Sequence, residues 1–199
     1  MLFLVALTGC IPESEHPITP LYSAEQDKEL TGLWTSEDEE SVRYLHIGAE
    51  LEKGITEDEA EEGLMRFWLV THRTSDGRTG VEKPFSMRFF VSKCRENQFA
   101  NAVLPIEETP GVPAAGAAKY YFMKYKIVGD ELNVWGIDFA AAAAAIDRGE
   151  LGGTVVREGS ELKSVQFTDS SEHLMVYLSG GGADKLFPEK GKTVFRRIH

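Results

Sequence analysis

The chain consists largely of short runs of aromatic and β-branched residues separated by turn residues, and this pattern limits the folds open to it. In Lys119–Val128, Tyr121, Met123 and Tyr125 alternate with residues that include lysines, and Gly129-Asp130 follows as a tight-turn sequence. Successive strand side chains point to opposite faces, so the alternation predicts a half-buried strand. The predicted strands are Leu30–Trp34, Ser41–Ile47, Leu64–Arg73, Phe85–Val91, Phe99–Leu104, Lys119–Val128, Leu132–Ile137, Thr154–Val156, Leu162–Phe167 and Thr193–Ile198. Together they predict a mainly β protein, an antiparallel barrel or sandwich.

Two short helices are predicted in the C-terminal half. Asp138 is a suitable N-cap for Phe139–Arg148, which contains a run of alanines, and Gly149 suits the position after the helix. Asp169 and Glu172 fit a capping box that starts a second helix. Because alanine favours helix but buries little apolar surface, we expect the first helix to lie close against the barrel.

The chain begins with the apolar run Met1–Ala6, which ends in Leu7-Thr8-Gly9-Cys10. This run is too short to span a bilayer, which needs roughly 20 apolar residues, and it matches the apolar part of a secretory signal. The four residues resemble the lipobox of bacterial lipoproteins. The resemblance implies that residues 1–9 are a signal peptide and that Cys10 carries acyl chains such as palmitate. The competing interpretation is a buried N-terminal strand that ends in a cysteine.

The segment after Cys10 is rich in proline, with Pro12, Pro17 and Pro20 among polar residues. Proline fixes φ and removes a hydrogen-bond donor, so regular structure is not expected. We predict that residues 10–27 form a tether between the lipid anchor and a folded domain. The residue after Cys10 is Ile11 rather than an aspartate, which in lipoproteins of this kind favours the outer membrane.

The charge balance excludes one class of partner. Lys and Arg total 21 and Asp and Glu total 32, a net charge of −11. A field of this sign repels nucleic-acid phosphates, so nucleic-acid binding is not expected. Of the two cysteines, Cys10 is assigned to the anchor, which leaves Cys94 without a partner. An unpaired thiol in an oxidising compartment favours a buried structural cysteine; the alternative is a reactive thiol or an intermolecular disulfide.

The first predicted strand contains Gly32-Leu33-Trp34, which resembles the Gly-x-Trp signature of the lipocalin superfamily. The resemblance implies an up-and-down barrel whose tryptophan packs across the closed end beneath a basic residue of the last strand, here Arg196 or Arg197. With two helices instead of one, the chain is more similar to small lipocalin-like lipoproteins of bacteria. The expected fold is therefore a mainly β, antiparallel lipocalin-like barrel of about 8–10 strands with two short helices in the C-terminal half. The predicted division is a signal peptide (1–9), a Pro-rich tether (10–27) and a lipocalin-like β-barrel domain (28–199).

The sequence carries none of the common catalytic motifs. It lacks a G-x-S-x-G elbow, an H-E-x-x-H motif, a C-x-x-C motif and a P-loop. His46 and His72 lie on predicted strands and could approach each other as metal or ligand contacts, although ordinary hydrogen-bonded histidines are more common. The acidic runs Glu37–Glu40 and Glu57–Glu62 are interpreted as solvated loops, and the loop Pro105–Ala118 as a candidate contact region. No metal and no cofactor is predicted.

These features predict a non-enzymatic binding or scaffold module, lipid-anchored through Cys10 in a bacterial cell envelope, with the outer membrane facing the periplasm as the expected location. Its partners would be the membrane and a protein or small apolar ligand. The aromatic residues Trp68, Phe89, Tyr121 and Trp135 are expected inside the barrel, as a packed core or as the wall of a small apolar pocket. The alternatives are an acidic inhibitor of a basic protein such as a lysozyme, and an enzyme with an unrecognised site.

Overall fold

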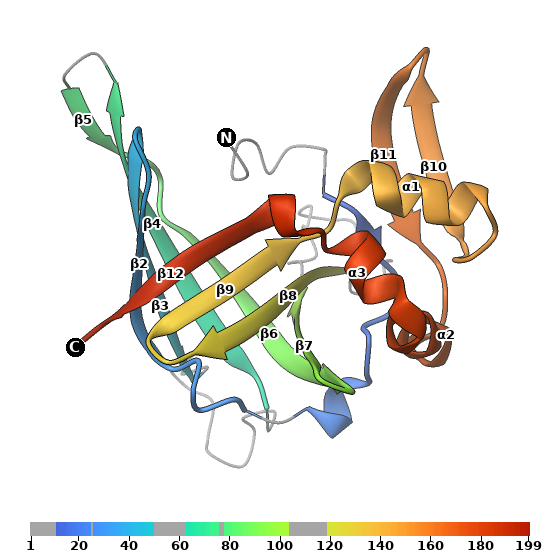
Figure 1. Ribbon diagram of the computed structural model, residues 1–199, viewed down its shortest axis with the longest axis horizontal. Helices are drawn as coiled ribbons and strands as arrows, with labels where there is room; N and C mark the ends of the chain where they lie inside the picture. The colour runs from blue at the N-terminus through green and yellow to red at the C-terminus, as the bar shows by residue number, and fades with distance from the viewer. Residues whose placement is uncertain (1–10, 25, 50–62, 76–77, 104–118) are drawn as a thin grey trace, which may run out of the picture.

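A computed structural model describes residues 11–24, 26–49, 63–75, 78–103 and 119–199, and within these ranges eight antiparallel strands close into a barrel (Figure 1). Each strand pairs with the next, β12 pairs with both β9 and β2, and β8 pairs with β9, so the barrel sheet has no free edge. The barrel strands are β2 (Gly32–Glu37), β3 (Ser41–Ala49), β4 (Met65–Ser75), β6 (Phe85–Cys94), β7 (Asn97–Val103), β8 (Tyr120–Val128), β9 (Glu131–Gly136) and β12 (Lys192–Ile198). The predicted fold class is confirmed.

The two ends of the barrel are built differently. One end, which we call the mouth, carries the β2–β3 turn and the short strand β5 (Arg78–Val81) that pairs with the end of β4. The other end, which we call the closed end, carries the β6–β7 and β8–β9 turns and the C-terminal end of β12. The C-terminus lies at this closed end in Figure 1, away from β5.

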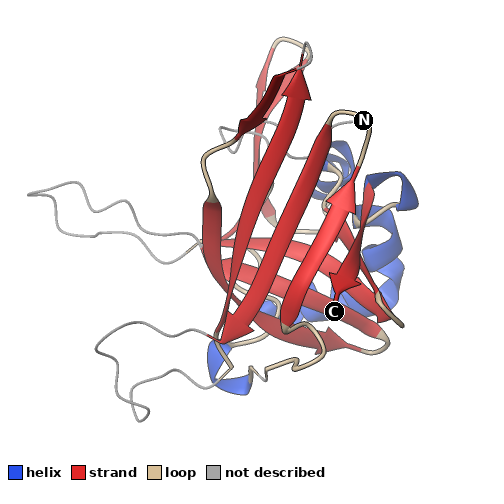
Figure 2. Cartoon of the chain, turned by 90° about the vertical axis from the view of Figure 1, so that its left-hand side faces the viewer, coloured by secondary structure: helices blue, strands red, loops and turns tan. Residues whose placement is uncertain are grey.

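Both predicted helices are present, between β9 and β12. They are α1 (Phe139–Asp147) and α2 (Ser171–Tyr177), and α2 continues through a π turn (Leu178–Gly182) into α3 (Ala183–Leu186). The Asp138 side chain accepts the backbone N–H of Ala141, as expected of the N-cap, whereas Ser170 rather than Asp169 caps α2. Figure 2 shows the helices gathered on one side of the barrel.

Small residues allow the polyalanine helix α1 to pack closely on the structure beside it. Ala142, Ala143 and Ala145 are buried, and a Cβ on Gly153 would lie 2.6 Å from a carbon of Ile146. Gly153 begins the hairpin of β10 (Gly153–Glu158) and β11 (Glu161–Phe167), against which α1 packs. The absence of large side chains therefore brings the helix and the hairpin close together.

Two hydrophobic clusters form the core. One fills the barrel and consists of Leu30, Trp34, Leu45, Ile47, Met65, Leu69, Met87, Phe89, Val91, Ala100, Ala102, Tyr125, Leu132 and Phe195. The other lies between the outer face of the barrel and the helices, and it includes Phe99, Phe122, Trp135, Phe167 and Phe187. Several barrel strands are therefore buried on both faces.

The proline-rich segment is part of the fold, in contrast to the expected tether without regular structure. Pro12, Ser14 and Ile18 are fully buried, and β1 (Glu13–Ser14) pairs with β11 and with Tyr120 at the start of β8. The Ile18 N–H donates to the buried Asn101 side chain over 2.8 Å. The prolines do not prevent this docking, because side chains on β7 and α2 satisfy the segment's backbone groups: Ser171 Oγ donates to the Pro17 carbonyl. The folded part thus extends to Ile11 instead of starting at Lys28.

Among the described residues, no helix is both long enough and apolar enough to cross a membrane.

Candidate functional site

Trp34 seals the closed end of the barrel. Its ring is fully buried, and its Nε1–H donates to the Leu30 carbonyl over 2.8 Å. The Arg197 guanidinium lies 4.0 Å from the centre of the ring and donates to the backbone carbonyls of Thr31 and Glu29. Of the two arginines proposed for this position, the structure places Arg197 there; Arg196 points outward and pairs with Glu131. The tryptophan, the arginine and the preceding loop together close this end.

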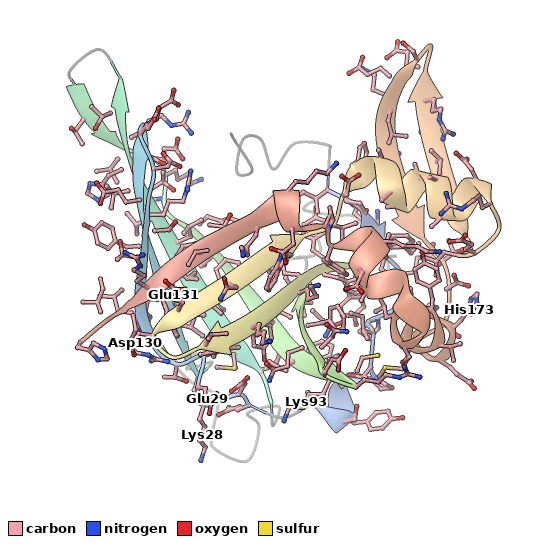
Figure 3. The ribbon with its side chains drawn as sticks, viewed as in Figure 1. Lys28, Glu29, Lys93, Asp130, Glu131 and His173 are labelled. Carbon is pink, nitrogen blue, oxygen red and sulfur yellow. The ribbon has the colours of Figure 1, made fainter. Side chains whose placement is uncertain are left out.

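Asp27 ties the same loop to the barrel wall. Its carboxylate accepts the Tyr125 hydroxyl over 2.8 Å and the Gln98 amide over 3.2 Å. Burial, with this hydrogen bond to Asp27, raises the pKa of the Tyr125 hydroxyl well above its usual range. Figure 3 shows the charged side chains of Lys28, Glu29 and Asp130 at this end of the barrel, where they face solvent.

Tyr125→Phe is expected to change the pH dependence of stability. A hydroxyl with a raised folded-state pKa contributes stability that is fully present below its unfolded pKa of about 10 and is lost as the pH rises above it. The native protein should therefore lose stability above about pH 10, and Tyr125→Phe should flatten that slope while costing about 1 kcal/mol at neutral pH. Urea unfolding from pH 7 to 11 measures both effects, and an unchanged alkaline slope would contradict the assignment to Tyr125.

The inward-facing positions only partly match the expected aromatic lining. Phe89 and Tyr121 face into the barrel, as predicted. The prediction is wrong for Trp68, which pairs with His46 on the outer surface, and for Trp135, which packs among the helices. Trp135 Nε1 donates to Glu189 there over 3.1 Å. Because the helices bury the outer face of β9, hydrophobicity alone does not tell which side of that strand faces inward.

The interior above Trp34 is lined by apolar side chains, not all of which are fully buried. Ala100 and Ala102 occupy inward positions on β7, and Met123 lies opposite Ala100 on β8. Met123, Phe85 on β6 and Val134 on β9 pack on the interior cluster but keep part of their surface accessible. The interior therefore has apolar side chains that water, or a ligand, can reach.

On β3 and β4, polar side chains occupy the inward positions nearest the mouth. Ser41 and Thr71 are buried there, and Arg43, whose side chain is 16% exposed, pairs with Asp38 over 2.7 Å. Arg73, on the same face of β4, pairs with Glu82 over 3.0 Å, and its buried Nε lacks a hydrogen-bond partner. The barrel is thus apolar at depth and polar, with two arginines, at its entrance.

The acidic run Glu37–Glu40 forms the β2–β3 turn at the mouth. The Asp38 carboxylate accepts the backbone N–H groups of Glu40 and Ser41, and it also pairs with Arg43. Although partial burial opposes ionisation, these hydrogen bonds lower the pKa of Asp38 to about 2. Asp38 therefore stabilises the turn, while the three glutamates around it remain exposed.

The histidines and the buried cysteine do not form a site with one another. His46 and His72 both face outward, but their partners Trp68 and Val42 place them four positions apart along the strands, about 13 Å. Cys94 is a buried free thiol with its Sγ 2.9 Å from Ser179 Oγ. Among the residues that the structure describes, no three His, Cys, Asp or Glu side chains gather as a metal site would require.

His173, on α2 (Figure 3), bonds to Asp169 over 2.7 Å at the start of the helix. The other predicted positions, namely Cys10 with its lipobox, Glu57–Glu62 and Pro105–Ala118, lie outside the described residues.

Comparisons with protein-family models, with curated proteins and with solved structures found no match for the chain.

Proposed function

We propose that this protein is a non-enzymatic binding module that holds a small apolar ligand in its barrel and is attached to the envelope membrane through a lipid on Cys10. The observation that supports a ligand in the barrel is the contrast between its closed end and its interior. Trp34 and Arg197 close one end, whereas the interior above them presents accessible apolar side chains from Phe85, Met123 and Val134. Binding sites for small ligands are commonly of this kind, mostly apolar with a few polar groups.

The distribution of polarity supports a ligand with one polar end. An apolar chain would contact the interior cluster, and a polar group would remain near Arg43 and Arg73 at the entrance. Both arginines have carboxylate partners of their own, so the ligand's polar group needs no full negative charge.

The anchor is supported by Leu7-Thr8-Gly9-Cys10, and mass spectrometry of the mature N-terminus tests it: an unmodified Cys10 or a retained Met1 would refute the anchor.

Filling the interior is expected to weaken ligand binding strongly. Val134 faces inward on β9, so Val134→Phe places a larger side chain in the accessible space. The affinity for the uncharged fluorophore N-phenyl-1-naphthylamine should fall about tenfold or more, since a filled site loses most of its apolar contact. Fluorescence titration with this probe and with a long-chain fatty acid measures the change.

Val194→Phe is the matched control. Val194 lies on the neighbouring strand β12, is also partly buried, and faces outward opposite Asn133. This variant should bind both probes with the native affinity. If the native protein binds neither probe, or if the two variants weaken binding equally, a ligand inside the barrel is ruled out and the scaffold role remains.

A further inference from the structure

The docked N-terminal segment determines which end of the barrel faces the membrane. Ser14 pairs with Tyr120, the first residue of β8, and Tyr120 pairs with Val103, the last residue of β7. Tyr120 and Val103 both lie at the mouth of the barrel. The Glu13 carboxylate pairs with Lys119 at the same level, and burial, together with the charge of Glu13, raises the pKa of Tyr121, which faces into the barrel. The described chain therefore begins beside the mouth.

Little chain is left between this docked segment and the predicted lipid. Cys10 precedes Glu13 by three residues, so its Cα lies at most about 11 Å from that of Glu13. Pro12 is already fully buried, and Ile11 is 42% exposed. The fold thus leaves no flexible spacer that could let the barrel turn over relative to an anchored Cys10.

We propose that the mouth of the barrel rests on the phospholipid bilayer and that the closed end points away from it. This orientation depends on the lipid anchor of the proposed function. Two hairpins, β4–β5 and β10–β11, rise from the barrel and its helical side in the direction opposite to the C-terminus (Figure 1), and both would meet the membrane. A ligand of the barrel would then enter from the bilayer rather than from the aqueous phase.

Charge does not drive this contact. Glu37, Glu39 and Glu40 are exposed on the β2–β3 turn at the mouth and would be repelled by anionic lipid. The bilayer is therefore held against the mouth by the covalent anchor, and the chain without lipid should not bind vesicles. This property separates the proposal from an electrostatic membrane patch.

Three exposed valines provide matched positions for the test. Val81 on β5 and Val156 on β10 are 61% and 52% exposed and belong to the two hairpins, whereas Val128 is 56% exposed at the closed end. Each is replaced by cysteine in a Cys94→Ser background, in which the introduced hydroxyl can still hydrogen-bond to Ser179. The lipidated proteins are labelled with a maleimide fluorophore and reconstituted in phosphatidylcholine vesicles that contain a headgroup-attached quencher.

Quenching of the labels at positions 81 and 156 is expected to be severalfold stronger than at position 128. Equal quenching at all three positions, or stronger quenching at position 128, would overturn the orientation. The same labelled chains without lipid should show no quenching with these vesicles. Quenching of these chains would show that the protein surface binds the bilayer directly, and it would overturn the dependence on the anchor.

The orientation can be separated from the anchor itself. If mass spectrometry shows that Cys10 is not lipidated in cells, the proposed anchoring fails. The full chain with a free Cys10 thiol, in the Cys94→Ser background, is then coupled to a maleimide lipid in vesicles. Hydrogen exchange should slow in residues 79–82 and 154–158 and stay unchanged in 128–131. The reverse pattern would refute the orientation independently of how the cell treats Cys10.

Discussion

Replacing Trp34 with alanine is expected to lower the free energy of unfolding by about 3–5 kcal/mol, the usual range for removing a fully buried tryptophan. The indole fills the closed end, donates to the Leu30 carbonyl and carries the Arg197 guanidinium on its face. The variant leaves a cavity at the point where the barrel interior meets the preceding loop. Urea denaturation followed by circular dichroism measures the loss.

Trp68→Ala is the control for Trp34→Ala. Trp68 has the same side chain on a barrel strand, but it lies on the outer surface and is 37% exposed. Its contacts are with His46 and Arg66 on the surface. Its removal should therefore lower the free energy of unfolding by less than about 1 kcal/mol. If both variants lose the same stability, Trp34 is not the residue that closes the barrel.

Asn101→Ala is expected to cost about 2–4 kcal/mol and to release the N-terminal segment. The Asn101 side chain is fully buried; its oxygen accepts the Ile18 N–H, and its amide donates to the Phe90 carbonyl and to Ser92 Oγ. Alanine would leave the buried Ile18 N–H without its partner. Denaturant unfolding measures the stability, and limited proteolysis of residues 11–19 measures the release.

Asn133→Ala provides the comparison for this second effect. Asn133 is also a buried asparagine on a barrel strand, but its amide makes only a 3.4 Å contact with the Lys126 carbonyl. Its replacement should cost about 1 kcal/mol or less and leave the N-terminal segment resistant to protease. A segment that stays resistant in Asn101→Ala would show that other contacts hold it. In Asn101→Ala, release of the N-terminal segment should also reduce the difference in quenching between the labels at positions 81 and 156 and the label at position 128.

The strand pattern predicted an antiparallel β fold because local sequence carries most of that information, and the resemblance to the lipocalin signature favoured a barrel over a sandwich. Alternation in Lys119–Val128 correctly placed Tyr121, Met123 and Tyr125 on the inner face of β8, where the outer lysines mark the other face. The Gly-x-Trp sequence and a basic residue in the last strand predicted the contact that Trp34 makes with Arg197. The lipobox at Cys10 and the function built on it remain predictions.

The incorrect placements involve strands and segments whose surroundings come from distant parts of the chain. Trp135 lies on the outer face of β9, and the helices that follow β9 bury that side. Trp68 is large and apolar, yet its register with His46 places it on the exposed face. Composition could not separate these cases, because a residue's face depends on pairing register and on what covers the sheet.

The sequence by itself determined an antiparallel β fold and its two helices, because strand alternation, helix caps and turn residues act over a few neighbouring positions, and the resemblance of Gly32-Leu33-Trp34 to the lipocalin signature added the tryptophan that seals one end. Only the tertiary structure decided that the proline-rich segment docks beside the mouth. That docking depends on hydrogen bonds such as the one from Ile18 to Asn101, which joins residues 83 positions apart, and no local pattern records such a contact.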